Sequence, residues 1–142
     1  NEAEKVKGFL EEVGTKKYNI IAQKEDMSHL IKIYEVIKNN EVLCLHGDRF
    51  VEGARTFEVD FLGKKAHFPA GPFQMIAKLK APFAFVFAHK TTKSHYHFTA
   101  NGTKNNTQKP ESIAQEFATL LEEKVKAHPD HWFNYYDFFQ TP

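Results

Sequence analysis

A run of aromatic residues in the middle of the chain alternates with smaller residues. Phe83, Phe85 and Phe87 occupy every second position of the segment 83–88. Because successive side chains of a β-strand point to opposite faces, the three rings share one face. The other face carries small side chains, against which a helix can pack closely. The pattern predicts a buried central strand in a sheet covered by helices.

Helical and strand-like patterns alternate along the rest of the chain. Apolar residues at helical spacing predict helices over 2–13, 26–38, 72–80 and 110–127. Short apolar or alternating segments predict strands over 18–22, 41–45, 57–61, 66–68 and 95–100. Segments 57–61 and 66–68 are joined by a turn and form an edge hairpin. We expect an α/β fold with a mixed, mostly parallel sheet flanked by helices.

Length and charge limit the class of protein. A chain of 142 residues with 42% hydrophobic residues can bury a core without metals or disulfides, so a single domain over 1–142 is expected. The net charge of +1 argues against nucleic acid as a partner. No segment reaches the length of a membrane span, and no signal peptide opens the chain, so a soluble segment is expected.

The single cysteine, Cys44, lies inside the apolar run 41–45. One cysteine cannot form a disulfide within the chain, which fits a reducing compartment. The continuous apolar run is typical of a strand buried on both faces of a parallel sheet. The Cys44 thiol is therefore expected to be a small core residue.

Polar residues follow directly after this expected strand. His46, Asp48 and Arg49 surround Gly47 at its carboxyl end. In open α/β sheets, ligands bind outside the carboxyl ends of the strands. The imidazole, the carboxylate and the guanidinium could orient a base or bind a phosphate, but an Asp-Arg pair at this position is equally often a structural ion pair.

The eight histidines suggest a metal site only weakly. His95 and His97 share a face of a predicted strand, and His128 and His131 are three positions apart, but neither pair has matching ligands nearby in sequence. We expect hydrogen-bonded or solvated histidines and no bound metal. The chain also has no phosphate-binding loop and no dinucleotide fingerprint, so no cofactor is expected.

The C-terminal segment 132–139 contains six aromatic residues in eight positions. Such a cluster suits a membrane interface or an apolar ligand. For most of these rings, packing of the segment back onto the sheet is the favoured alternative.

Four motifs in a fixed order resemble the lipid A biosynthesis acyltransferase family. They are Gly-Asp-Arg at 47–49, the hairpin 61–73 with Phe-Pro-Ala-Gly-Pro-Phe at its end, Ala81-Pro82 before an apolar strand, and His128-Pro129 before Trp-Phe-Asn-Tyr at 132–135. Each motif is short, and their order covers nearly the whole chain. The resemblance implies a glycerolipid-acyltransferase-like fold.

The resemblance also implies a function. Such enzymes transfer a fatty acyl group from acyl carrier protein, or in relatives from coenzyme A, to a hydroxyl or amine of a lipid acceptor such as a lipid A precursor. They act at the cytoplasmic side of the bacterial inner membrane, with peripheral membrane contact. Asp48 and Arg49 match residues at the end of the central strand, so the resemblance assigns them to substrate binding or to organising the catalytic centre. His46 departs from the family pattern and is grouped with them as a candidate substrate-binding residue.

The family places its catalytic base in a His-x₄-Asp/Glu motif, which no histidine of this chain matches. We therefore expect the C-terminal part of an acyltransferase, with the motif upstream of these residues. Two alternatives remain open. One is a non-catalytic α/β module that binds an acyl carrier or a lipid, and the other is a histidine-based zinc hydrolase.

Overall fold

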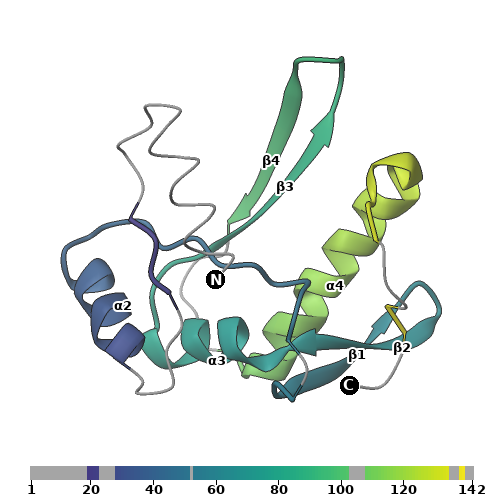
Figure 1. The fold of residues 1–142 in the computed structure, drawn as a ribbon. Helices are drawn as coiled ribbons and strands as arrows, with labels where there is room; N and C mark the ends of the chain where they lie inside the picture. The colour runs from purple at the N-terminus through teal and green to yellow at the C-terminus, as the bar shows by residue number, and fades with distance from the viewer. Residues whose placement is uncertain (1–18, 23–27, 52, 103–107, 135–137, 140–142) are drawn as a thin grey trace. The chain divides into compact units, whose positions relative to one another are not determined.

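A computed structural model describes residues 19–22, 28–51, 53–102, 108–134 and 138–139 (Figure 1). The chain folds as two compact units, Asn1–Cys44 and Leu45–Pro142. The single domain over 1–142 stays a prediction. The helix expected over 2–13 lies outside the described residues.

The first unit contains helix α2, Ser28–Lys38, which confirms the helix expected there. Ile33 is its buried side chain. The helix ends where Asn40 adopts a positive φ of 56°, a conformation that asparagine tolerates better than most residues. The Glu41 N–H then donates to the Val36 carbonyl at 2.9 Å and closes the helix end.

The strands expected over 18–22 and 41–45 are not observed in the described residues, and position 18 lies outside them. Residues 19–22 and 41–45 have no regular secondary structure. Val42 is 88% exposed, and the expectation of a buried thiol is wrong because Cys44 is exposed too. An apolar run predicts a strand only where neighbouring strands accept its hydrogen bonds, and none of the described strands pairs with this segment.

The second unit begins with the expected hairpin. Strands β1, Thr56–Phe61, and β2, Lys64–Pro69, pair antiparallel. The two turn residues, Leu62 and Gly63, have φ values of 52° and 76°, as a tight type I′ hairpin turn requires. Val59 lies opposite Ala66, and both side chains are buried on the face that meets the core.

A second hairpin corrects the expected sheet topology. Strands β3, Ala84–Lys90, and β4, Tyr96–Gly102, pair antiparallel, and all strand pairs in the described part of the chain are antiparallel. The expectation of a mostly parallel sheet is therefore wrong. Five residues separate β3 from β4, and a parallel crossover needs a dozen or more. Because β3 pairs only with β4 among these strands, it is not a central strand.

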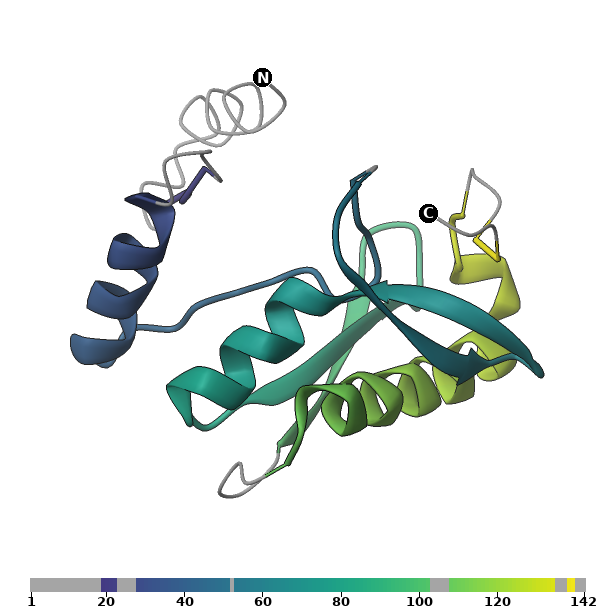
Figure 2. The same cartoon turned by 90° about the horizontal axis from the view of Figure 1, so that it is seen from below.

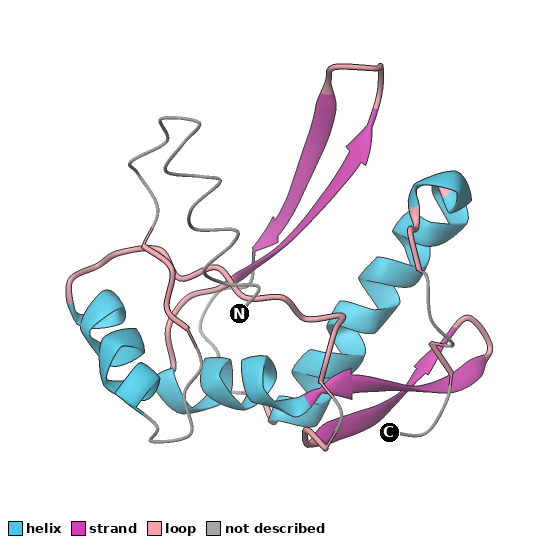
Figure 3. Ribbon diagram, viewed as in Figure 1, coloured by secondary structure: helices cyan, strands magenta, loops and turns pink. Residues whose placement is uncertain are grey.

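Two helices complete this unit (Figure 3). Helix α3, Ala70–Leu79, follows β2 directly, and helix α4, Pro110–Ala127, is followed by a short 3₁₀ turn, η1, Pro129–His131. Pro110 occupies the first turn of α4, where its missing N–H costs no hydrogen bond. Figure 2 shows α4 running along the β1–β2 hairpin. The fold is mixed α/β, as expected, although its sheets are small.

The core is largely aromatic. Phe61, Phe68 and Phe73 are almost completely buried. The ring of Phe117 in α4 contacts aromatic rings from β2, α3 and β3, and its centroid lies 6.0 Å from Phe68, 5.7 Å from Phe73 and 5.3 Å from Phe85. One side chain of α4 therefore joins three other elements.

The C-terminal aromatic segment packs back onto the β1–β2 hairpin. The Trp132 and Phe138 rings lie 5.6 and 5.4 Å from the Phe61 ring, centroid to centroid. Phe139 contacts the same ring at 6.4 Å. Phe133 is the exception, because 65% of it is exposed. Packing is thus confirmed for three of these rings, while positions 135–137 lie outside the described residues.

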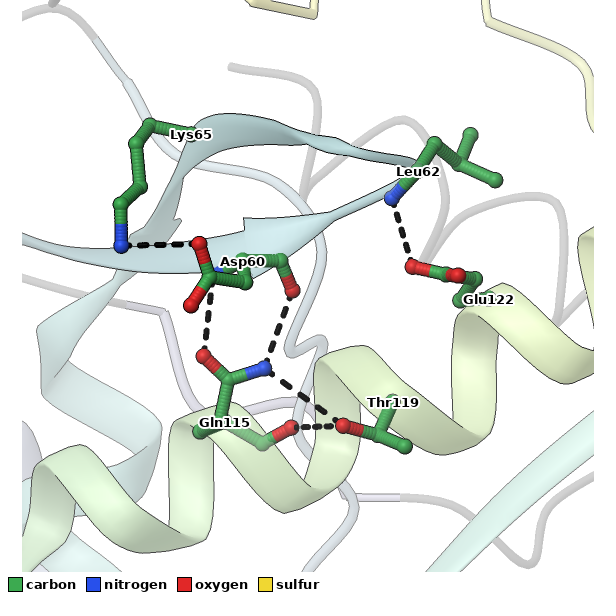
Figure 4. A network of polar contacts seen from close by, with 6 residues as sticks. All are labelled: Asp60, Leu62, Lys65, Gln115, Thr119 and Glu122. Carbon is green, nitrogen blue, oxygen red and sulfur yellow. Dashed lines mark hydrogen bonds and ion pairs between the residues drawn. The ribbon is translucent and has the colours of Figure 1, made fainter.

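Polar side chains of α4 form hydrogen bonds with the backbone of β1 and of the turn that follows it (Figure 4). The Gln115 amide accepts a hydrogen bond from the Asp60 N–H at 2.9 Å and donates to the Asp60 carbonyl at 3.0 Å. Further along the helix, the Glu122 carboxylate accepts from the Leu62 N–H at 2.6 Å and pairs with Lys126. The bond to Lys126, and then the bond to the Leu62 N–H, lower the pKa of Glu122.

Candidate functional site

The segment 46–49 is anchored to the core through its glycine. A Cβ placed on Gly47 would lie 3.1 Å from the Phe117 ring and 3.4 Å from the Phe73 ring. An added methyl group would press on both rings, so close packing favours glycine at this position. The contact fixes where the backbone of His46, Asp48 and Arg49 leaves the core.

The three predicted site residues lie together around a bend. The Arg49 Nε lies 3.6 Å from the Asp48 Oδ2, which is a loose ion pair. The Arg49 side chain is 67% exposed, and His46 is exposed as well. An exposed guanidinium can still form a bidentate contact with a carboxylate or phosphate of a substrate.

A second group of polar residues lies at the C-terminal end of α4. A cavity of about 80 Å³, here called the histidine pocket, is formed where β3 meets the end of α4 and η1. Its apolar wall consists of Phe87, Ala88, Leu121, Val125 and Trp132, and its polar wall of His89, Lys124, His128 and His131. The segment 46–49 contributes no residue to this pocket.

The imidazole rings of the pocket are stacked. The His89 and His128 ring centroids lie 4.1 Å apart with an interplanar angle of 14°, and the His128 and His131 rings lie 5.6 Å apart at 10°. His97 is not one of the lining residues, and its ring lies 5.1 Å from the His89 ring at an interplanar angle of 45°. Partial burial, then the nearby His128, His97, His131 and Lys124, lower the pKa of His89, which favours its neutral form.

Stacking does not create a metal site. Parallel rings direct their faces at each other, whereas metal ligation needs ring nitrogens that converge on one point. Within the described ranges, no group of three or more His, Cys, Asp or Glu residues is arranged to bind a metal ion. The zinc-hydrolase alternative therefore has no ligand set among these residues.

The sequence shows the histidines of the histidine pocket but does not show that they lie close together in the fold. The spacing of His128 and His131 is visible, and so is the pair of His95 and His97, yet nothing local links His89 to either pair. The register of the β3–β4 hairpin makes this link, because it places His89 directly opposite His97. His95 instead lies at the hairpin tip, where its ring contacts the Thr92 hydroxyl at 3.0 Å.

Within the same described ranges, no helix is both long enough and apolar enough to cross a membrane.

Comparison with known families decides the identity of the chain. The model of the bacterial lipid A biosynthesis acyltransferase family matches residues 14–141. The chain belongs to this family. The match confirms the resemblance drawn from the four short motifs, and it spans both units of the lipid A acyltransferase chain. Among curated proteins, none matches the chain.

Membership in the lipid A acyltransferase family indicates the general chemistry. A protein of this class uses an acyl donor and a lipid acceptor. The segment 46–49 lies inside the matched region, as do all residues of the histidine pocket.

Proposed function

We propose that these residues form the C-terminal part of a bacterial acyltransferase that moves a fatty acyl group from acyl carrier protein, or coenzyme A, to a membrane lipid such as a lipid A precursor. The observation that carries the proposal is the family match over residues 14–141. The protein would act at the cytoplasmic side of the inner membrane. Transfer from a thioester needs a base for the acceptor's proton and donors for the developing oxyanion.

In this proposal, Asp48 and Arg49 bind substrate and His46 lies beside them. The exposed Arg49 guanidinium supplies a charged donor for an anionic group of the donor or acceptor. Asp48 pairs with it and limits the directions in which the guanidinium points. Gly47 holds both residues near the core through the Phe117 ring. None of the three is assigned the role of the base.

The test is acyl transfer by the natural protein that contains these residues. The protein is incubated with an acyl-loaded acyl carrier protein and a lipid A precursor, and the lipid is analysed by mass spectrometry. We expect the acceptor to gain the mass of one acyl chain. An unchanged acceptor, with acyl-coenzyme A as donor as well, would contradict the proposal.

A non-catalytic binding module is the second candidate, because the sequence contains no His-x₄-Asp/Glu motif. Such a module would bind an acyl-loaded carrier protein or a lipid without changing it. Binding measured by calorimetry, together with an unchanged acceptor in the transfer assay, would favour this alternative. The coding sequence upstream of Asn1 distinguishes the two directly, since the enzyme requires the motif there.

A further inference from the structure

The β3–β4 hairpin belongs to a long segment of one charge sign. Between Asp60 and Glu111 the sequence contains eight lysines and no acidic residue. Lys90 and Lys93 lie at the closed end of the hairpin. The hairpin therefore carries positive charge with no carboxylate of its own to neutralise it.

One face of this hairpin is apolar and exposed. The register pairs Val86 with Ala100 and Ala88 with Phe98, and the period of two places these side chains on one face with Tyr96. We call this set the outer face. Phe98 is 67% exposed, Tyr96 60% and Val86 57%. The opposite face, with Phe85 and Phe87, packs against the core.

Lysine lies at the margin of the outer face. Lys90 follows Val86 and Ala88 on the same face of β3, and its Nζ lies 5.8 Å from the centroid of the Tyr96 ring. The end of the hairpin that bears Lys90 lies apart from α3 and the β1–β2 hairpin (Figure 1). An aromatic and apolar centre with ammonium groups at its margin is typical of surfaces that rest on a lipid headgroup layer.

We propose that the outer face of the β3–β4 hairpin binds the surface of an anionic phospholipid membrane. Phe98, Tyr96 and Val86 enter the boundary between headgroups and acyl chains, while Lys90 and Lys93 contact the phosphates. The absence of carboxylates in the hairpin removes repulsion from the negative surface. The proposal rests on the proposed function, because the membrane is what presents the lipid acceptor.

The experiment measures vesicle binding by the full chain. The protein is floated with vesicles of equal parts phosphatidylglycerol and phosphatidylcholine, and with vesicles of phosphatidylcholine alone. We expect binding to the anionic vesicles that weakens as salt is added, because salt screens the lysine charges. Equal binding to both vesicles, or binding to neither, would overturn the proposal.

Variants of the outer face locate the contact. Phe98→Ser should reduce the partition coefficient on anionic vesicles about tenfold, because a buried aromatic side chain is lost from the membrane. Phe133→Ser is the matched control, since Phe133 is 65% exposed and lies outside the hairpin. Equal losses for the two variants would contradict the assignment to the outer face.

The lysines give an independent test that does not touch the apolar side chains. Lys90→Gln and Lys93→Gln should each reduce binding to anionic vesicles about fivefold. Lys32→Gln in α2 is the control with an exposed lysine elsewhere. If a thermal melt shows that Phe98→Ser does not fold, the two lysine variants alone test the proposal. Binding to anionic vesicles at the wild-type level by both lysine variants would overturn it.

An acidic acyl carrier protein is the competing partner for this positive surface. If the lysine variants lose affinity for the carrier protein but bind anionic vesicles as the wild type does, the membrane proposal is wrong. The vesicles contain no acyl donor, so failure here is distinct from failure of acyl transfer, which is assayed with an acceptor dispersed in detergent.

Discussion

The Phe61 ring joins the β1–β2 hairpin to the aromatic rings of the C-terminal segment. Phe61 is fully buried and contacts the rings of Phe68, Trp132 and Phe138. It is also the last residue of β1, so its ring lies where the C-terminal segment meets the closed end of the hairpin. Loss of the ring would leave a cavity between the hairpin and the C-terminal segment.

Phe61→Ala should therefore lower the free energy of unfolding by about 3–5 kcal/mol. Phe98→Ala should change it by about 0.5 kcal/mol or less, because Phe98 is exposed. Urea unfolding followed by circular dichroism measures both. Similar losses for the two variants would contradict the burial described for Phe61.

Gly47 offers a second test at the scale of one residue. Gly47→Ala places a methyl group 3.1 Å from the Phe117 ring and should destabilise the chain by about 1–3 kcal/mol. Gly71→Ala in α3 is the control, because nothing lies within 4 Å of its added Cβ. That variant should be neutral or stabilise by about 0.4–1 kcal/mol. Thermal melts that rank the two variants in the reverse order would contradict the packing of segment 46–49.

At the scale of elements, α4 stabilises the β1–β2 hairpin from outside as well as through the core. Its Gln115 side chain makes two hydrogen bonds to the backbone of Asp60. Gln115→Ala should cost about 1–2 kcal/mol of stability by urea unfolding. Thr119→Ala chiefly removes a bond to the Gln115 carbonyl within the helix and should cost less. A larger loss for Thr119→Ala would contradict this role of Gln115.

The contact between β3 and the end of α4 should depend on pH. The pKa of His89 is lowered in the folded chain, so the unfolded chain takes up its proton first as the pH falls. Stability is then full above the ordinary value of 6.5 and decreases below it. The groups facing His89 are His97, His128, His131 and Lys124, and none of them is a carboxylate.

We therefore expect the melting temperature to decrease as the pH is lowered from 8 to 5. The decrease should be smaller in the variant His89→Asn. His95→Asn at the hairpin tip is the control and should leave the pH dependence as it is. Glu122, whose pKa is lowered, loses its contribution only at lower pH, through and below its ordinary value of 4.5. An unchanged pH profile in His89→Asn would contradict a lowered pKa for His89.

The sequence predicts most helices and strands because the pattern that indicates each of them lies within one short segment. The hairpin 57–68 follows from strict alternation around a turn, and α4 follows from an apolar stripe that begins at Ile113, after the helix start at Pro110. The run 41–45 is different, since an apolar sequence does not reveal whether strands are available to pair with it. The sequence does not predict the histidine pocket for a related reason, because His89 and His128 meet only through tertiary packing.

At the scale of the whole molecule, the second unit has an aromatic core, with one polar candidate site beside the middle of α4 and another at its C-terminal end. Segment 46–49 rests on the Phe117 ring, and the histidine pocket closes over Leu121 and Val125. The family match covers both sites, and the candidate substrate residues Asp48 and Arg49 are the ones that the sequence motif singled out.

The most direct test of the proposed function is the effect of Asp48 and Arg49 on acyl transfer by the natural protein. Arg49→Gln and Asp48→Asn should lower kcat/KM about 10–100-fold, the effect of losing a charged hydrogen bond to substrate, while the melting temperature stays near the wild-type value. Lys65→Gln and Asp60→Asn remove another exposed ion pair, 2.8 Å long, and should leave kcat/KM unchanged. Wild-type kcat/KM in both Arg49→Gln and Asp48→Asn would contradict the substrate-binding role of this segment.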